Sequence, residues 1–262
     1  MTDRETGTWL YAVAGELDQP LLGSLTGVAG EPLRIVQAAG LGAVAGSVPL
    51  DSFGEQALRR NFEDLDWLGR IARTHDKVVE AVVRAGPAVP LRLATVYLDD
   101  DRVKVVIQRR RHDFERTLRH VAGRTEWGVK ALQNRPTAAK PVARTAGDPP
   151  SRGAGTAYLQ RRRTQLVARE RGERFAAEQA ADIHSALSTR AVDTRRHRPQ
   201  SQELSGGKLP MILNAAYLVD DEAAGDFIRT VSDLEEEHEA IRLQLTGPWP
   251  PYSFSSLEEG TP

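Results

Sequence analysis

The sequence contains no cysteine, so disulfides, thiol nucleophiles and thiolate metal sites are excluded. This composition fits a reducing compartment, where proteins rarely use disulfides. A long hydrophobic run is also missing. The longest uncharged stretch, residues 35–50, is interrupted by glycines and Pro49, whereas a membrane-spanning helix needs about 20 mostly apolar residues. Asp3 and Glu5 stand where a secretory signal would carry positive charge, and we expect a soluble protein.

An excess of charge of one sign is missing as well. The 35 basic residues balance the 36 acidic residues, which leaves a net charge of −1 and no global field that would attract nucleic acid or an anionic membrane. Apolar residues make up 40% of the 262 positions, enough to fill a core. A chain of this length has room for one large domain or two ordinary ones.

The clearest pattern lies in residues 209–254. An apolar run over residues 211–219 predicts a strand that is covered on both faces. Asp220 and Asp221 then suit the start of a helix, whose apolar positions recur at steps of three and four. Apolar and polar residues alternate over 241–246, which predicts a half-buried strand that Gly247 and Pro248 end. The expected buried positions of the helix are Ala224, Phe227, Ile228, Val231, Leu234 and His238.

The rest of this half completes a recognisable order of elements. Residues 125–132 alternate as a strand, residues 158–187 predict a long helix, and residues 192–198 predict a polar edge strand. A loop rich in Pro, Gly, Ala and Thr lies near residues 134–155. The order β-α-β-β-α-β predicts a ferredoxin-like domain, with an antiparallel sheet and both helices on one face, over residues 123–262.

The first half, residues 1–122, predicts a second α+β domain. One or two helical turns are expected near residues 20–25, a long helix between Phe62 and Val82, and a further helix from Asp99 to Val121. His75 lies on the apolar stripe of the long helix, so a packed, hydrogen-bonded core histidine is favoured there, as it is for His238. The expected strands cover residues 8–14, 33–38, 41–48 and 90–97.

Motifs for nucleotide or phosphate binding are weak. Residues 40–45, Gly40 to Ala45, fit the dinucleotide pattern G-x-G-x-x-A, but Pro49 would break the helix that this motif requires, which favours a hairpin of small residues. Gly206-Gly207-Lys208 lacks the flanking residues of a phosphate loop, since Gln202 and Leu209 stand at the required positions. The histidines do not have the spacing of a helical zinc site.

Two arginine runs, residues 109–111 and 161–163, remain as candidates for phosphate binding. Acidic residues stand beside both runs, so solvated helix faces are favoured. The alternative function is therefore a nucleotide- or phosphate-binding protein that uses Gly40 to Ala45 or these arginine-rich helices.

The C-terminal segment Trp249-Pro250-Pro251-Tyr252-Ser253-Phe254 is the most distinctive group of residues. Its prolines restrict the chain, and its three aromatic side chains supply a large apolar area. Two interpretations remain open. In one, the tail over residues 247–262 folds back onto the protein's own core; in the other, Trp249, Tyr252 and Phe254 dock onto another protein, because rigid aromatic anchors bind at a lower cost in ordering.

Several stretches together resemble the gas vesicle protein F/L family. These are TWLYAVAG (residues 8–15), VPLRLATV (89–96), TEWGVK (125–130), LNAAYLV (213–219) and TGPWPPYSF (246–254). The second stretch resembles the family's P-x-R-F-G-T motif, and Leu93-Ala94 stands where the family usually has Phe-Gly. The matches run in order over nearly the whole chain.

The resemblance implies a role in gas vesicle formation, as an accessory or minor structural protein in the cytoplasm or on the vesicle. The implied partners are the small, hydrophobic main shell protein and other gas vesicle accessory proteins. It implies no enzymatic activity, metal or nucleotide cofactor, and it implies two α+β domains with a ferredoxin-like second domain. Arg92 of the central motif joins Trp249, Tyr252 and Phe254 as a candidate partner-binding residue.

Overall fold

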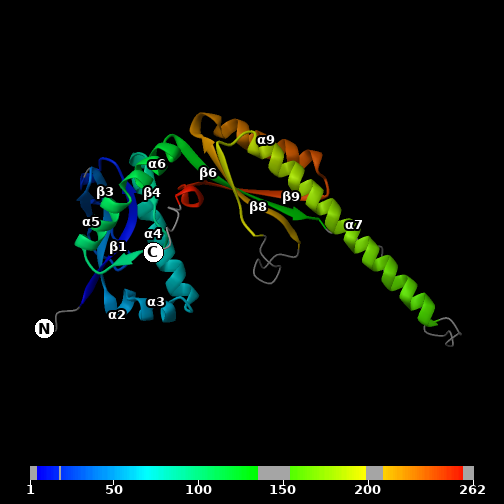
Figure 1. Ribbon diagram of the computed structural model, residues 1–262, viewed down its shortest axis with the longest axis horizontal. Helices are drawn as coiled ribbons and strands as arrows, with labels where there is room; N and C mark the ends of the chain where they lie inside the picture. Colours follow the sequence, from blue (N-terminus) through cyan, green and yellow to red (C-terminus); the bar gives the residue numbers. More distant parts are fainter. Residues whose placement is uncertain (1–4, 18, 135–153, 199–208, 256–262) are drawn as a thin grey trace. The chain divides into compact units, whose positions relative to one another are not determined.

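A computed structural model describes residues 5–17, 19–134, 154–198 and 209–255 (Figure 1). The fold is mixed α+β with two sheets, and the chain divides into two compact units. Unit 1 contains residues 1–126 and 248–262, and unit 2 contains residues 127–247. The C-terminal segment thus belongs to unit 1, whereas the sequence pattern placed it with the second domain.

The sheet of unit 1 is built around its first strand. Strand β1 (Thr6–Ala14) pairs antiparallel with β3 (Leu41–Pro49) on one side and with the short strands β4 (Ala88–Pro90) and β5 (Val96–Tyr97) on the other. Strand β2 (Leu33–Ala38) forms a hairpin with β3 through Ala39 and Gly40, both at positive φ. The order is β2-β3-β1-β4, with β5 also against β1. The predicted hairpin at Gly40 is confirmed.

Helices cover both faces of this sheet, which explains the unbroken apolar run in β1. One core contains Trp9, Tyr11 and residues of α4 (Leu65–Ala85), while the other contains Leu10, Val13 and residues of α5 (Asp100–Arg109) and α6 (Arg111–Val121). Successive side chains of a strand point to opposite faces, so both sets must be apolar. The short helices α1 (Gln19–Leu22), α2 (Leu50–Phe53) and α3 (Glu55–Asn61) complete unit 1.

The helices of unit 1 differ from the prediction in three respects. Helix α4 begins after Asp64, whose carboxylate accepts hydrogen bonds from the backbone N–H groups of Asp66 and Trp67. The helix thus begins later than the predicted start at Phe62, and both Phe62 and Leu65 are exposed. The single helix predicted for residues 99–121 is two helices separated at Arg110, and helices α2 and α3 were not predicted because they are shorter than a periodic pattern can reveal.

The strand predicted for residues 90–97 is wrong. The chain leaves β4 after Pro90, makes a turn in which Thr95 Oγ1 and N–H both bond to the carbonyl oxygen of Arg92, and enters β5 at Val96. Ala94 lies in this turn with φ of 65°, a left-handed conformation that favours glycine. Local alternation of residues cannot reveal such a turn, although the resemblance to a motif with glycine at this position was a signal.

Replacing Ala94 with glycine is expected to stabilise unit 1. The left-handed conformation costs an alanine about 1–2 kcal/mol, and the greater entropy of an unfolded glycine offsets part of the gain. We expect Ala94→Gly to raise the free energy of unfolding by about 0.5–1 kcal/mol. Urea denaturation measures the change. Ala122→Gly is the control, since Ala122 has φ of −62° and should gain nothing; equal effects of both variants would refute the explanation.

Unit 2 contains a four-stranded sheet in the order β7-β8-β6-β9. The strands are β6 (Arg124–Gln133), β7 (Asp193–Arg196), β8 (Met211–Asp220) and β9 (Ile241–Trp249), and the helices are α7 (Ala154–Ser188) and α9 (Ala224–Glu237). Side chains of both helices pack in one core with alternate residues of β6, β8 and β9. Strand β7 lies at the edge, as predicted.

Some details of unit 2 depart from the expected pattern. Asp221 opens a single 3-10 turn, Asp221–Ala223, before α9 begins. Ile228 is exposed, although it was predicted on the buried face. Strand β9 continues through Gly247 and Pro248 to Trp249 instead of ending at them. Most of the loop predicted near residues 134–155 lies outside the described residues, as does the Gly206-Gly207-Lys208 sequence.

Candidate protein-interaction site

The closing segment of the chain packs onto unit 1. Residues 252–254 form a single 3-10 turn, in which Phe254 is 6% exposed, and the following Ser255 is also buried. Tyr252 is half-buried against the core that contains Trp9 and Tyr11. Trp249, by contrast, is 48% exposed. Of the two interpretations of the tail, these contacts favour folding back onto the protein's own core for Tyr252 and Phe254.

Polar contacts fix this segment in place. Ser253 donates to the buried carboxylate of Glu126 twice, from its backbone N–H at 2.8 Å and from its hydroxyl at 2.6 Å. The hydroxyl of Tyr252 donates to Asp76 Oδ1 at 2.9 Å. Burial and the neighbouring Asp76 carboxylate raise the pKa of Tyr252, so its hydroxyl stays protonated as a donor. Glu126, a charged residue of the predicted strand over residues 125–132, is buried because it binds the tail.

His75 lies beneath the tail and is satisfied on both ring nitrogens. Trp9 Nε1 donates to its Nδ1 at 3.1 Å, so Nε2 carries the proton and donates to the carbonyl oxygen of Leu91 at 3.0 Å. Its ring stacks against Tyr11 and Tyr252, with centroids 5.2 and 6.5 Å away. Burial lowers the pKa of His75, which keeps the ring neutral. The prediction of a packed core histidine is confirmed.

A buried carboxylate next to this cluster also has a structural explanation. Glu31 accepts hydrogen bonds from the Tyr11 hydroxyl at 2.9 Å and from the backbone N–H of Ala29 at 2.8 Å. A Cβ atom at Gly27 or Gly46 would lie within 2.0 Å of Glu31 Oε1, so both positions require glycine for this side chain to fit. Because donors of the protein bind both of its carboxylate oxygens, Glu31 stabilises the fold and is not placed to act as a catalytic base.

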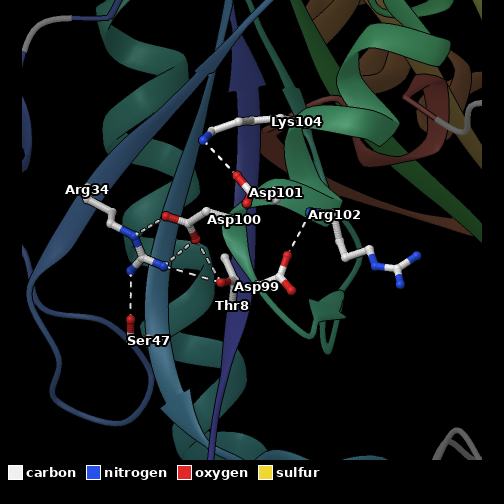
Figure 2. Close-up of polar contacts among 8 residues, drawn as sticks. All are labelled: Thr8, Arg34, Ser47, Asp99, Asp100, Asp101, Arg102 and Lys104. Carbon is white, nitrogen blue, oxygen red and sulfur yellow. Dashed lines mark hydrogen bonds and ion pairs between the residues drawn. The ribbon is translucent and has the colours of Figure 1, made fainter.

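Arg34 and Asp100 form a polar cluster that joins helix α5 to the sheet (Figure 2). Arg34 donates to both carboxylate oxygens of Asp100, at 3.0 Å from Nε and 2.6 Å from a terminal nitrogen. Thr8 donates to Asp100 at 2.8 Å, and Arg34 also donates to Ser47. Strands β1 and β2 thus bind the first turn of α5, and Ser47 on β3 binds Arg34. The Arg34 guanidinium lowers the pKa of Asp100, with a further contribution from Thr8.

The ion pair between Arg34 and Asp100 is expected to make the free energy of unfolding depend on pH. Asp100 has a lower pKa folded than unfolded, so its contribution is present above about pH 4 and is lost as the pH falls through the folded pKa. Asp100→Asn should lower the free energy of unfolding by about 1 kcal/mol at pH 7, since both side chains are partly exposed.

Urea unfolding at pH 7 and at pH 3.5 tests this prediction. The difference between wild type and Asp100→Asn should shrink at the lower pH. The matched control is Asp101→Asn, whose side chain is 88% exposed and forms an ion pair with Lys104; it should change little at either pH. A penalty for Asp100→Asn that is equal at both pH values would contradict the role of the ion pair.

Two of the predicted partner-binding residues line one small cavity. Arg92 and Tyr252 border a space of about 210 Å³ in unit 1, together with Leu10, Val13, Phe114 and other residues of β1, α5 and α6. Arg92 is exposed, on the turn between β4 and β5. Phe254 and Trp249 do not border this cavity. The four candidates therefore do not form a single surface, and only Arg92 and Trp249 are exposed.

A larger cavity of about 650 Å³ in unit 1 was not predicted. It lies where β1, α4 and α6 end, and its lining is mostly apolar. Its residues are distant from one another in the sequence, from Ala14 to Ala122, and apart from Glu16 and Arg119 they are apolar or glycine. The sequence contains only an indirect signal of this cavity, because small residues and Pro87 follow the last apolar positions of two helices.

The motifs for phosphate chemistry lose their structural basis. Gly40 to Ala45 lies in the β2–β3 hairpin, so no helix begins within it to hold a pyrophosphate. Arg110 and Arg111 form ion pairs with Asp113 and Glu115 on their own helix. In the second run Arg162 and Arg163 are exposed on α7. Across the described ranges, histidine and acidic residues do not gather in a group of three or more that would hold a metal ion.

The helices that the structure describes include none long and apolar enough to cross a membrane. This finding covers only the described parts of the chain, residues 5–17, 19–134, 154–198 and 209–255.

Comparisons with known proteins agree on one family. The family model described as "Gas vesicle synthesis protein GvpL/GvpF" matches residues 7–256. Gas vesicle protein L of a Streptomyces species is 38% identical over 96% of this chain and 93% of its own length, and gas vesicle protein L1 of Halobacterium salinarum is 28% identical over 95% and 90%. The crystal structure of GvpF from an Anabaena species superposes with a TM-score of 0.65 at 19% identity, covering 97% of this chain and 98% of that one.

Proposed function

Because the chain belongs to the GvpL/GvpF family of gas vesicle synthesis proteins, we propose that it acts in gas vesicle formation by binding the hydrophobic main shell protein. The family match over nearly the whole chain is the observation that carries this proposal. The family supports a gas vesicle role in general; the shell protein as direct partner is the step that we add. Other gas vesicle accessory proteins are the further partners that the proposal expects.

The physical argument starts from the partner. A shell subunit that must repel water on one face is prone to aggregate before it enters the wall, because large apolar patches and open strand edges associate without specificity. A protein that covers this face would keep the subunit in solution until the growing wall takes it up. The apolar cavities in unit 1 supply surfaces for such contact. The proposal requires no catalytic group and no cofactor.

We interpret residues 127–247 as a ferredoxin-like unit within this protein. The order β6-α7-β7-β8-α9-β9 and the sheet order β7-β8-β6-β9 support this interpretation, as does the packing of α7 and α9 in one core. Unit 2 would then be one of the two structural units of the protein, and unit 1 would be the other.

Co-expression tests the proposed function. The shell protein is produced in a host without gas vesicle genes, alone or together with the tagged full chain, and the soluble and pelleted fractions are compared. We expect the chain to raise the soluble fraction of the shell protein and to retain it on the affinity resin. If the shell protein pellets equally in both cases and does not co-purify, the proposed function is wrong.

A nucleotide screen tests the alternative function. Saturating ATP, GTP or NAD should leave the melting temperature of the chain unchanged, since the hairpin at residues 40–45 offers no helix to bind phosphates. A ligand at 100 times its dissociation constant would stabilise the fold by about 2.7 kcal/mol, which such a screen detects readily. A shift of that size would favour the nucleotide-binding alternative over the present proposal.

A further inference from the structure

The 650 Å³ cavity in unit 1 is formed at the ends of three elements. Strand β1 ends at Ala14, helix α4 at Ala85 and helix α6 at Val121. The residues that follow each end form the lining together with the last turns of the helices. They include Ala14, Glu16, Leu17, Ala85, Arg119 and Ala122.

The lining is poorly suited to a polar small molecule. Sites for such ligands combine apolar walls with several convergent polar groups that fix the ligand's orientation. Here the charged side chains are Glu16 and Arg119, both of them exposed. The other lining residues are apolar or glycine. The cavity is therefore suited to an apolar partner surface whose own polar groups are already satisfied.

This requirement selects the conformation of the partner segment. An extended peptide would bring unpaired backbone N–H and C=O groups against apolar walls, at a cost of about 1–3 kcal/mol for each group left without a hydrogen bond. A helix satisfies its backbone internally and presents only side chains. The walls of the cavity thus favour the apolar face of a helix, as in other helix-in-groove complexes.

Charge around the cavity indicates which charged residue the partner helix should carry. Two helices, α4 and α6, point their C-terminal ends toward the lining, and each such end carries a partial charge of about −0.5. Arg84 in the last turn of α4 is already paired with Glu80. Arg119 in the last turn of α6 offsets the partial charge of that helix end, which leaves the end of α4 and the Glu16 carboxylate as the negative groups around the cavity. These groups favour a partner with a lysine or arginine beside its apolar face.

We propose that this cavity receives the apolar face of an amphipathic helix of the shell subunit, with a basic residue of that helix beside Glu16. The inference rests on the proposed function and assigns it a surface. Binding buries the apolar lining of the cavity, and the basic residue fixes the orientation of the bound helix. Neither Trp249 nor Phe254 takes part, because neither lines the cavity.

Two exposed alanines allow the cavity to be filled without removing any packing. Ala85 and Ala122 both line it and both are exposed, so tryptophan at either position should occupy the space while leaving the core unchanged. We expect Ala85→Trp and Ala122→Trp each to reduce retention of the shell protein at least tenfold in the co-expression assay. Glu16→Lys should weaken retention severalfold, and more at low salt than at high salt.

The matched control is Ala177→Trp, an equally drastic change at an exposed alanine on α7 in unit 2, and it should retain the shell protein like wild type. Thermal unfolding of each variant verifies that the fold is intact, and Ala85→Ser and Ala122→Ser serve as milder substitutions that should retain binding. If both tryptophan variants bind like wild type, the assigned surface is wrong and the proposed function survives. If wild type itself fails to bind, both proposals are overturned.

Discussion

Replacing Trp9 with alanine is expected to lower the free energy of unfolding of unit 1 by about 3–5 kcal/mol. Trp9 is fully buried in the middle of β1 and packs against Tyr11, Phe53 and His75. Its removal leaves a large cavity and also deprives His75 Nδ1 of its donor. Urea denaturation followed by circular dichroism measures the loss.

The chain supplies its own control for this substitution. Trp249 is the same residue type but 48% exposed, so Trp249→Ala should cost less than about 1 kcal/mol. Trp9→Phe separates the two contributions, because it retains most of the volume while removing the hydrogen bond to His75. Similar losses for Trp9→Ala and Trp249→Ala would contradict the description of β1 as the centre of the core.

Replacing Phe254 with alanine is expected to cost about 3–5 kcal/mol as well, and to loosen the closing segment. Phe254 is 6% exposed, and the segment around it contributes the hydrogen bonds of Ser253 to Glu126 and of Tyr252 to Asp76. The same unfolding experiment measures the change in stability. Proteolysis within residues 248–255 should become faster at the same time.

Phe175→Ala is the comparison for this prediction, since Phe175 is 48% exposed on α7 and should matter little. A loss for Phe254→Ala as small as that for Phe175→Ala would favour the other interpretation, a tail that docks onto a second protein. The expected loss of stability for Phe254→Ala also limits which variants can be used in binding assays. A double variant of Trp249 and Phe254 would confuse loss of binding with loss of folding, whereas Trp249→Ala alone tests docking by the exposed part of the tail.

Periodicity predicted the elements that repeat over many residues. Apolar residues at steps of three and four predicted α4, α7 and α9, and the apolar runs predicted β1 and β8. The small residues around Gly40 predicted a hairpin correctly, because the positive φ at that position favours glycine. Each of these predictions uses a requirement that local sequence shows directly, either the repeated burial of apolar residues or the conformation of one turn.

The parts that were missed depend on contacts between distant residues. The turn at Ala94 and the break at Arg110 interrupt patterns that look continuous in the sequence. The burial of Glu126 follows from hydrogen bonds to Ser253, which lies 127 residues away. The large cavity is lined where β1, α4 and α6 end, and no local sequence pattern shows that these ends meet in the fold. Tertiary contacts of this kind override local preference.

The central claim, that this chain works by holding the hydrophobic shell subunit, is tested most directly by photo-cross-linking in cells that form gas vesicles. A photoreactive phenylalanine derivative replaces Ala122 at the cavity or, in separate strains, the exposed residues Ala177 and Trp249. We predict an adduct with the mass of one shell subunit from position 122 and none from position 177. Absence of a shell adduct from positions 122 and 249 alike would contradict the claim.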